Sequence, residues 1–407
     1  MHFMWKVTRK VFRKIHLYAG LTAGLVVIAV CLSGTIYVYN TEIREWADKD
    51  RYVVPVGEDR FSLDELREQL ESNLGGTVTS VQAYGDAERS VVFSLKKSGE
   101  DRPSNYFVNP YTGKILANNK EKTTAETWMG YMFSLHRWLL LDQVEKPILS
   151  SMSNMELGRL INGIATLLFL LGVLTGVIIW FPQKVSAWKQ GLKIKWSGNW
   201  KRVNHDLHNT LAFYSLVFLF IMSVTGPFWS FQWYREGWQK TWDTFQVPKP
   251  EQKAENEAPK LPAEFFSLDE ILAKTNKQLP YKGSSRISIP SYMAEPISVS
   301  KSQTGFWARA GADQLLFGQE GLELTEVKLF SDLSFRQQVG RSVKSLHTGE
   351  IFGQATKFVW FLVCLIATSL PITGTLIWWN RRTKKQQLRR ASRRKPSINR
   401  KTEVSVS

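Results

Sequence analysis

Four long apolar runs, none containing Asp, Glu, Lys or Arg, constrain the fold of this chain more than any other feature of its sequence. Each run is long enough for a helix to cross the roughly 30 Å of a bilayer's hydrocarbon core, which takes about 20 residues at about 1.5 Å per residue. We therefore expect an integral membrane α-helical bundle of four transmembrane helices and exclude a single soluble globule. The runs cover residues 15–40, 160–181, 207–234 and 358–380.

The basic residues predict which side of the membrane each connecting segment occupies. The 407 residues include 53 Lys and Arg against 36 Asp and Glu, and the surplus lies in residues 1–14, 182–206 and 381–407. Because cytoplasmic segments of membrane proteins are enriched in Lys and Arg, we expect these three segments, and with them both termini, to be cytoplasmic. Topology accounts for the net charge of +17, so we expect a lipid membrane around the chain and no nucleic-acid partner.

The two cysteines give no framework for a disulfide or a metal site. Cys31 and Cys364 each lie inside an apolar run, and the sequence contains neither a CxxC nor a CxxCH motif. We therefore exclude a disulfide scaffold, a zinc knuckle and a covalently attached haem.

Several sequence features recur in the same order in the two halves of the chain. His16 precedes Gly34 by 18 residues, as His208 precedes Gly226. A shared order of this kind indicates an internal duplication, and because both halves run through the membrane in the same sense, we expect a parallel repeat. The other recurring features are FSLDEL at Phe61–Leu66 with FSLDEI at Phe266–Ile271, SLH at Ser134–His136 with SLH at Ser345–His347, and TGVIIW at Thr175–Trp180 with TGTLIW at Thr373–Trp378.

Each half is expected to carry a small α+β domain on the external side. In the first half, Ser62 is a suitable N-cap for an amphipathic helix over Ser62–Ser72, and alternating strands follow at Thr77–Tyr84 and Ser90–Lys96. The equivalents in the second half are the helix Ser267–Gln278 and the strands Arg286–Pro290 and Glu295–Lys301. The external segments are 41–123 and 235–334 for the two α+β domains, and 124–159 and 335–357 for the helical segments that contain SLH.

Motifs in the external and membrane segments resemble a known family. A helix beginning FSLDEL, followed by strands and then by YFVNPYTGKIL at Tyr106–Leu116, resembles a PepSY domain. The whole chain resembles the PepSY-associated transmembrane family over nearly all of its 407 residues. Members of this family include bacterial inner-membrane ferric-siderophore reductases that hold two b-type haems. The motifs that carry this resemblance are KIHLYAGLTAGL at Lys14–Leu25, SLHRWLL at Ser134–Leu140, DLHNTLAF at Asp206–Phe213 and SLHTGEIFG at Ser345–Gly353.

The resemblance implies two haem b groups, and four histidines in matching positions of the two halves are their expected ligands. A neutral imidazole is a common axial ligand of haem iron. By the expected topology, His16 and His208 meet at the cytoplasmic side and hold one iron, whereas His136 and His347 hold the other on the external side. His205, one helical turn before His208, is the alternative ligand.

Small and basic residues near the histidines are further candidates for the haem pockets. Gly20 and Gly24 follow His16 at i+4 and i+8 and leave room on one helix face for a flat macrocycle, although small residues also serve close helix packing. The basic residues that are candidate partners of haem propionates, and that are otherwise solvated surface charges, are Arg13, Arg137 and Arg202.

The resemblance implies an oxidoreductase that moves electrons across the bacterial inner membrane. The resemblance implies a periplasmic ferric siderophore as the acceptor, with iron released as Fe(II), and no catalytic side chain beyond the haem ligands. No nucleotide-binding glycine motif occurs in the cytoplasmic segments, so we expect the electron donor to be a separate cytoplasmic partner.

Three alternatives remain open. The first is a PepSY-bearing membrane anchor that regulates or inhibits an external protease. The second is a haem cytochrome that serves a different external acceptor. The third is a transporter, against which the expected spans argue because they contain no broken helix and no intramembrane acid.

Overall fold

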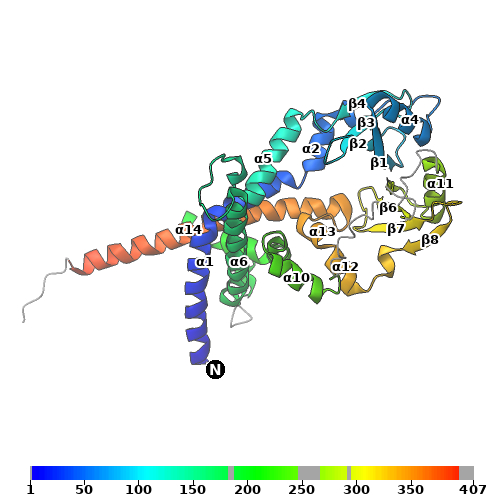
Figure 1. Ribbon diagram of the computed structural model, residues 1–407. Coiled ribbons are helices and arrows are strands. Elements are labelled where there is room, and N and C mark those ends of the chain that lie inside the picture. Colours follow the sequence, from blue (N-terminus) through cyan, green and yellow to red (C-terminus); the bar gives the residue numbers. More distant parts are fainter. Residues whose placement is uncertain (1, 182–187, 246–265, 291–294, 394–407) are drawn as a thin grey trace, which may run out of the picture.

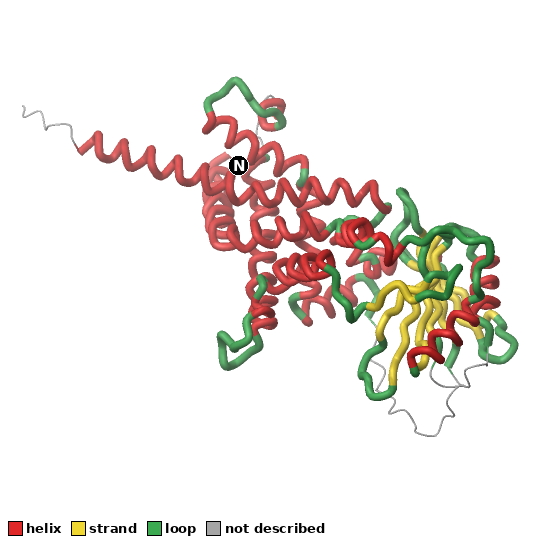
Figure 2. Tube along the Cα trace, turned by 90° about the horizontal axis from the view of Figure 1, so that it is seen from above, coloured by secondary structure: helices red, strands yellow, loops and turns green. Residues whose placement is uncertain are grey.

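The computed structural model describes residues 2–181, 188–245, 266–290 and 295–393. These residues form a helical bundle with an antiparallel β-sheet at one end of it (Figure 1, Figure 2). The start of α1 (His2–Tyr37) and the end of α14 (Gly353–Arg393) both lie on the side of the bundle away from the sheet (Figure 1).

Three helices among the described residues are long and apolar enough to cross a membrane, and a bent pair of helices makes a fourth span if the pair is counted as one. The three lie within α1, α6 (Asn154–Trp180) and α14. The bent pair consists of α8 (Trp200–Tyr214) and α9 (Leu216–Thr225), the latter continued by the 3-10 helix η3 (Gly226–Trp229). The α1 helix packs against both α6 and α14, and these two helices in turn pack against the bent pair.

The bend in the third span differs from the expected unbroken helix over 207–234. The α8 and α9 segments meet at Ser215 at an angle of 67°. The Ser215 hydroxyl donates a hydrogen bond to the carbonyl of Leu211 over 2.6 Å, and such back-bonding bends helices because it competes with the backbone ladder. The expectation of an unbroken helix was wrong. The absence of a broken helix therefore no longer argues against a transporter.

One sheet of eight antiparallel strands is built from both halves of the chain. The halves meet where β1 pairs with β5, with Ser80 opposite Ser288 and Tyr84 opposite Ser284. The strand order, β4-β3-β2-β1-β5-β6-β7-β8, is symmetrical about this pair. The sequence predicted a module in each half but not that the modules share a sheet. The strands are β1 (Gly76–Tyr84), β2 (Val91–Lys97), β3 (Ser104–Val108), β4 (Ile115–Asn118), β5 (Gly283–Ser288), β6 (Ile297–Gln303), β7 (Ala312–Phe317) and β8 (Leu324–Lys328).

Two helices, α4 (Leu63–Leu74) and α11 (Leu268–Gln278), share one buried apolar core with the strands of both halves. Ser62 caps α4 in a capping box, which confirms the N-cap predicted from the sequence, and Ser267 caps α11 in the equivalent position. Because a single core lies under both modules, the two halves of the sheet are stabilised as one unit.

The N-termini of α4 and α11 also cap each other. An Asp64 carboxylate oxygen accepts a hydrogen bond from the backbone N–H of Leu268 over 3.0 Å, and Asp269 accepts one from the N–H of Asp64 over 3.2 Å. Carboxylates are favourable at helix N-termini because the unpaired N–H groups there carry partial positive charge. These reciprocal bonds hold the two modules together at their surface.

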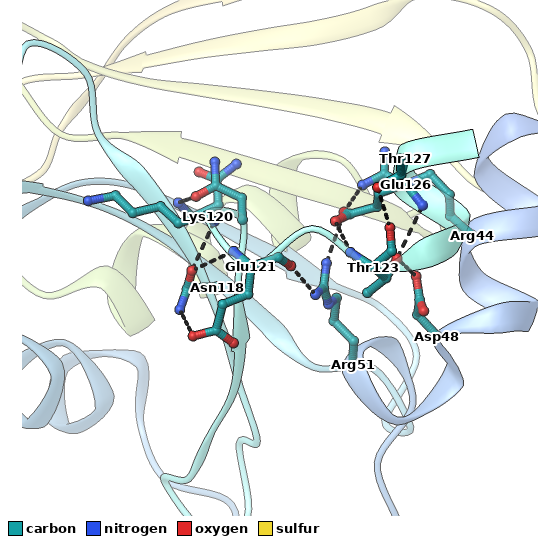
Figure 3. Close-up of polar contacts among 11 residues, drawn as sticks. Arg44, Asp48, Arg51, Asn118, Lys120, Glu121, Thr123, Glu126 and Thr127 are labelled. Carbon is teal, nitrogen blue, oxygen red and sulfur yellow. Dashed lines mark hydrogen bonds and ion pairs between the residues drawn. The ribbon is translucent and has the colours of Figure 1, made fainter. Parts of the chain in front are cut away.

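A network of ion pairs and hydrogen bonds fixes the start of α5 against α2 and α3 (Figure 3). Glu126 accepts hydrogen bonds from Arg44 and, over 2.9 Å, from the buried Arg51. The Thr123 hydroxyl accepts from the N–H of Glu126 and donates to Asp48 over 2.6 Å. The network therefore positions α5 at its N-terminal end. The helices involved are α2 (Asn40–Ala47), α3 (Lys49–Tyr52) and α5 (Thr124–Trp138).

We expect Glu126→Gln to lower the free energy of unfolding by about 3 kcal/mol, because breaking a buried ion pair leaves Arg51 without a counter-charge. Burial alone would raise the pKa of Glu126, but hydrogen bonds from Arg44 and Thr123 hold it below the ordinary 4.5. The charge of Glu126 therefore stabilises the fold above about pH 4.5, and this contribution is lost as the pH falls through the lowered pKa. Thermal unfolding of the detergent-solubilised protein measures both effects.

Glu121→Gln is the matched control for this prediction, because the Glu121 side chain bonds only Asn118 on the surface (Figure 3). Its unfolding temperature should match that of the wild type. Equal unfolding temperatures for Glu126→Gln and Glu121→Gln would contradict the stabilising role of the Glu126 ion pairs.

Lys357 makes a further connection between the halves, at the start of α14. Its side chain is 4% exposed, and Nζ donates to both carboxylate oxygens of Glu42 over 2.8 and 3.0 Å and pairs with Glu350 over 3.2 Å. The contact ties α2 to α14. The remaining helices are η1 (Leu141–Gln143), α7 (Trp188–Gly191), α10 (Gln232–Thr241), η4 (Phe330–Asp332), α12 (Phe335–Arg341) and α13 (Val343–Thr348).

Candidate functional site

The first histidine pair, His16 and His208, lies among the helices α1, α6, α8 and α14. The two ring centroids are 6.2 Å apart and the ring planes are 85° to each other. His16 on α1 places Nδ1 3.0 Å from the carbonyl oxygen of Gly172 on α6. His208 on α8 places Nδ1 2.9 Å from the hydroxyl of Thr373 on α14. The pair is therefore held by four helices, two of which supply rings and two of which supply hydrogen-bond partners.

The second pair, His136 and His347, lies on helices that enter the bundle from the side of the sheet (Figure 1). The ring centroids are 6.0 Å apart and the planes 62° to each other. Nδ1 of His136 lies 2.9 Å from the carbonyl oxygen of Val30 on α1, and Nδ1 of His347 lies 2.9 Å from the hydroxyl of Thr225 on α9. The structure thus brings together the two pairs that the sequence analysis matched.

The hydrogen bonds at Nδ1 determine which ring nitrogen is free. A carbonyl oxygen only accepts, so His136 donates through Nδ1. The Thr225 hydroxyl donates to the carbonyl of Ile221 over 2.8 Å and therefore accepts from His347. In the part of the chain that the structure describes, every hydrogen bond of the four paired rings is made by Nδ1. Each Nε2 therefore keeps a lone pair and has no protein partner.

This hydrogen-bonding pattern is the usual support for a metal-ligating histidine. Such a ring donates its second N–H to a carbonyl, a carboxylate or a hydroxyl, which fixes its orientation and tautomer and raises its basicity. Burial lowers the pKa of both His136 and His347, so these rings stay neutral at neutral pH. The neutral imidazole is the form that binds a metal.

A Ser/Thr-Gly dipeptide faces each of the four rings. A side chain added at Gly34 would place its Cβ 3.1 Å from Cε1 of His136, and one at Gly374 would place it 3.2 Å from Cε1 of His208. Both contacts are tighter than almost all real Cβ contacts, so a side chain at either position would push against the ring. The four combinations are Ser33-Gly34 with His136, Thr175-Gly176 with His16, Thr225-Gly226 with His347, and Thr373-Gly374 with His208.

The sequence analysis missed the role of these dipeptides. It used Gly34 and Gly226 as markers of the repeat, and Thr175 and Thr373 appeared only inside the TGVIIW and TGTLIW motifs. The signal that identifies them is the fourfold recurrence of a hydroxyl residue followed by glycine within an apolar helix.

The distances within each pair fit an iron held between two imidazoles. A metal–imidazole bond is about 2 Å long, and the ring centroid lies roughly 1.1 Å beyond the ligating nitrogen, so two rings on one metal have centroids roughly 6 Å apart. The observed separations are 6.2 and 6.0 Å.

A cavity of about 440 Å³ lies beside the second pair and is lined by both His136 and His347. Its volume is within the range of about 300–1,000 Å³ for cofactor and small-molecule sites. The walls are mostly apolar and include Phe169, Trp229 and Trp360, and the charged residues among them include Arg137 and Lys344. A flat, mostly apolar cofactor with charged substituents at one edge fits this distribution.

The other candidate ligand, His205, is placed differently from the four paired histidines. Its side chain is 44% exposed, and its contacts are with Asn209 over 3.1 Å and Asp206 over 3.6 Å on its own helix. Gly20 borders open space, since a Cβ there would meet nothing within 4 Å, whereas Gly24 packs against Pro371 on α14. Gly20 is thus compatible with a pocket beside His16, and Gly24 serves helix packing.

Of the three basic candidates, Arg137 is the one that faces a cavity. It lines the cavity beside His136, its guanidinium lies 5.7 Å from the Phe133 ring centroid, and no carboxylate pairs with it among the described residues. Arg202 is already paired with Asp206 over 2.8 Å, and Arg13 is exposed. Arg137 is therefore the basic residue best placed to meet a cofactor carboxylate.

No group of three or more His, Cys, Asp or Glu side chains that could enclose a bare metal ion occurs among the described residues. Two protein ligands suffice only when a macrocycle supplies the others, as a porphyrin does for iron. The donor set therefore fits haem better than a mononuclear zinc or copper site.

A family model covers most of the chain. The family model described as the PepSY-associated TM region matches residues 13–381, which is most of the chain and contains all four paired histidines. No curated protein matches the sequence.

Proposed function

Because the chain belongs to the PepSY-associated transmembrane family, we propose that it is a di-haem oxidoreductase that carries electrons across the bacterial inner membrane. The electrons come from a cytoplasmic donor and reduce a ferric siderophore in the periplasm. The observation that carries this proposal is the presence of two histidine pairs, each with a centroid separation of about 6 Å and with Nε2 free.

The two pairs lie near opposite faces of the bundle. His16 belongs to one pair, and Gly34, 18 residues later on the same helix, faces His136 of the other. At about 1.5 Å per residue the two positions are roughly 27 Å apart along the helix, close to the roughly 30 Å of hydrocarbon in a bilayer. When bound, haem supplies a one-electron Fe(III)/Fe(II) couple at each position. The protein holds the ligands, excludes water and adjusts the potential through burial and hydrogen bonding.

The orientation of the chain in the membrane is inferred from the position of its basic residues relative to the sheet. The basic start of α1 lies at the end of that helix away from the sheet (Figure 1), and the positive-inside rule makes the side of such basic segments cytoplasmic. The sheet then lies in the periplasm. We infer that its symmetrical strand order reflects two PepSY-like modules of a parallel duplication, joined through β1 and β5.

A ferric siderophore is the acceptor that suits such a site. Siderophores are hard oxygen chelators and hold Fe(III) far more tightly than Fe(II), so transfer of one electron to the bound Fe(III) frees the iron as Fe(II). Arg137 and Lys344 line the cavity beside the second pair and would attract an anionic complex toward it.

Reoxidation kinetics test the acceptor. The dithionite-reduced, purified protein is mixed in a stopped-flow instrument with a panel of ferric siderophores, and haem absorbance is followed. We expect at least one siderophore to reoxidise the protein with formation of Fe(II), which ferrozine traps. Uniform inertness of the panel with a protein that contains haem would contradict the acceptor and favour a cytochrome with another partner.

A further inference from the structure

The second module of the sheet contains a small polar pocket that no step of the proposed electron transfer uses. The pocket has a volume of about 190 Å³ and lies between α11 and the strands β5 and β6, at the seam with the end of β1. Lys301 on β6 lines it and is only 3% exposed. A lysine is almost never this buried unless it is paired. Other residues in the pocket wall include Leu272 and Asn276 on α11, Tyr281, and Ser285 on β5.

The contacts of Lys301 use two of the three donors of its ammonium group and do not compensate its charge. Nζ donates to the side-chain oxygen of Asn276 over 2.8 Å and to the carbonyl of Leu279 over 2.7 Å, and it lies 5.0 Å from the Tyr281 ring centroid. All three partners are uncharged. Within the described residues no carboxylate forms an ion pair with Nζ. A buried charge without a counter-charge is costly.

The nearest acid on the neighbouring strand is engaged elsewhere. Asp313 lies opposite Lys301 in the pairing of β6 with β7. One of its carboxylate oxygens accepts from the Tyr281 hydroxyl over 2.8 Å, and the other accepts from the N–H of Phe330 over 2.7 Å. Asp313 therefore leaves the ammonium group of Lys301 available to an anion from outside the chain.

In the first module of the sheet, apolar residues occupy the positions that correspond to Ser285 and Lys301. Val78, the third residue of β1, lies opposite Leu95 on β2, and the two are 1% and 0% exposed. Ser285, the third residue of β5, lies opposite Lys301 on β6, and the two are 2% and 3% exposed. The symmetrical sheet thus has a buried apolar pair on one side and a buried Ser–Lys pair on the other.

We propose that this pocket binds a small monocarboxylate. Its carboxylate pairs with Lys301 and accepts from the Ser285 hydroxyl, and its apolar body lies against Leu272 and Tyr281. The size is suitable, because a protein cavity of roughly 150 Å³ holds a benzene molecule, and this pocket measures about 190 Å³. Ligands between acetate and benzoate fit it. Asn276 is exposed and marks the opening through which they enter.

Thermal unfolding of the purified full-length protein tests this site. Acetate, propionate, benzoate and phosphate are titrated separately at constant ionic strength and pH. We expect a saturable rise in unfolding temperature with at least one of the three carboxylates, since a ligand that binds only the folded state stabilises it. No rise with any carboxylate at millimolar concentration would overturn the proposal, and a rise with phosphate alone would overturn the carboxylate assignment.

The double variant Ser285→Val with Lys301→Leu copies the apolar pair of the first module. It should unfold at a higher temperature than the wild type without ligand and should lose the carboxylate response. Lys301→Gln keeps a neutral donor and should weaken carboxylate binding at least tenfold. This variant tests the site even if the double variant does not fold. Lys96→Leu, at an exposed lysine on β2, is the matched control and should respond as the wild type does. A response that persists without Lys301 would refute the site.

Discussion

Replacing His136 with alanine is expected to remove one of the two haems and to leave the other in place. The ring of His136 is one of two imidazoles that share a site 6.0 Å apart, and a haem iron held by His347 alone loses half of its axial ligation. The haem content per polypeptide, measured by the pyridine haemochrome method, should fall from two to one. The spectrum of the remaining haem should be that of a low-spin bis-histidine centre.

The other histidines supply the controls for this prediction. His347→Ala should give the same result as His136→Ala, whereas His16→Ala or His208→Ala should remove the other haem. His205→Ala should keep both, because His205 is 44% exposed and bonds within its own helix. The retained haem reports that the variant is folded. Two unchanged haems in His136→Ala would contradict the pairing of His136 with His347.

Gly34→Val is expected to lose the same haem as His136→Ala although no ligand is removed. A Cβ at Gly34 would lie 3.1 Å from Cε1 and 3.2 Å from Nδ1 of His136, so a branched side chain must displace the ring. His136 cannot yield freely, because Nδ1 bonds the carbonyl of Val30. Metal-site geometry tolerates displacements of only about 0.5 Å. We expect the haem content to fall from two toward one.

Gly130→Val is the matched control for Gly34→Val. Gly130 lies on α5 with His136, and a Cβ there would meet nothing within 4 Å. Its haem content should therefore stay at two. The equivalent test of the first pair is Gly374→Val, where the Cβ position lies 3.2 Å from Cε1 of His208. Equal haem contents of Gly34→Val and Gly130→Val would contradict the close contact between Gly34 and the His136 ring.

The elements that depend on local sequence were predicted best. The helix expected over Ser62–Ser72 is α4 at Leu63–Leu74, with the predicted cap at Ser62, because capping signals act within one turn. Three of the four apolar runs likewise give single helices long enough to span a membrane, because hydrocarbon thickness fixes their length. The family resemblance is confirmed by the match over residues 13–381.

Features set by contacts between distant residues were not predictable in the same way. The strand expected at Arg286–Pro290 is β5 at Gly283–Ser288, because its start is fixed by pairing with β6, where Gly283 lies opposite Gln303. The pairing of β1 with β5 joins segments that are far apart in the chain and leaves no local signal. The bend at Ser215, where α8 ends and α9 begins, interrupts an apolar run whose composition does not reveal it.

The sequence likewise predicted one part of the candidate site and not another. Topology alone matched His16 with His208 and His136 with His347, because each pair begins or precedes a span on the same side. The partners of the rings were not predicted, since the Val30 carbonyl and the Thr225 hydroxyl reach their histidines only after four helices pack. The alternating pattern predicts Lys301 only as the end of a strand, and its burial is a property of the folded sheet.

The most direct test of the electron-transfer account is a reduced-minus-oxidised absorption spectrum of the purified wild-type protein with its haem content measured on the same sample. The account predicts two b-type haems per chain, both low-spin and both reducible by dithionite. A folded, monodisperse protein that stays colourless when haem is supplied during expression would contradict it.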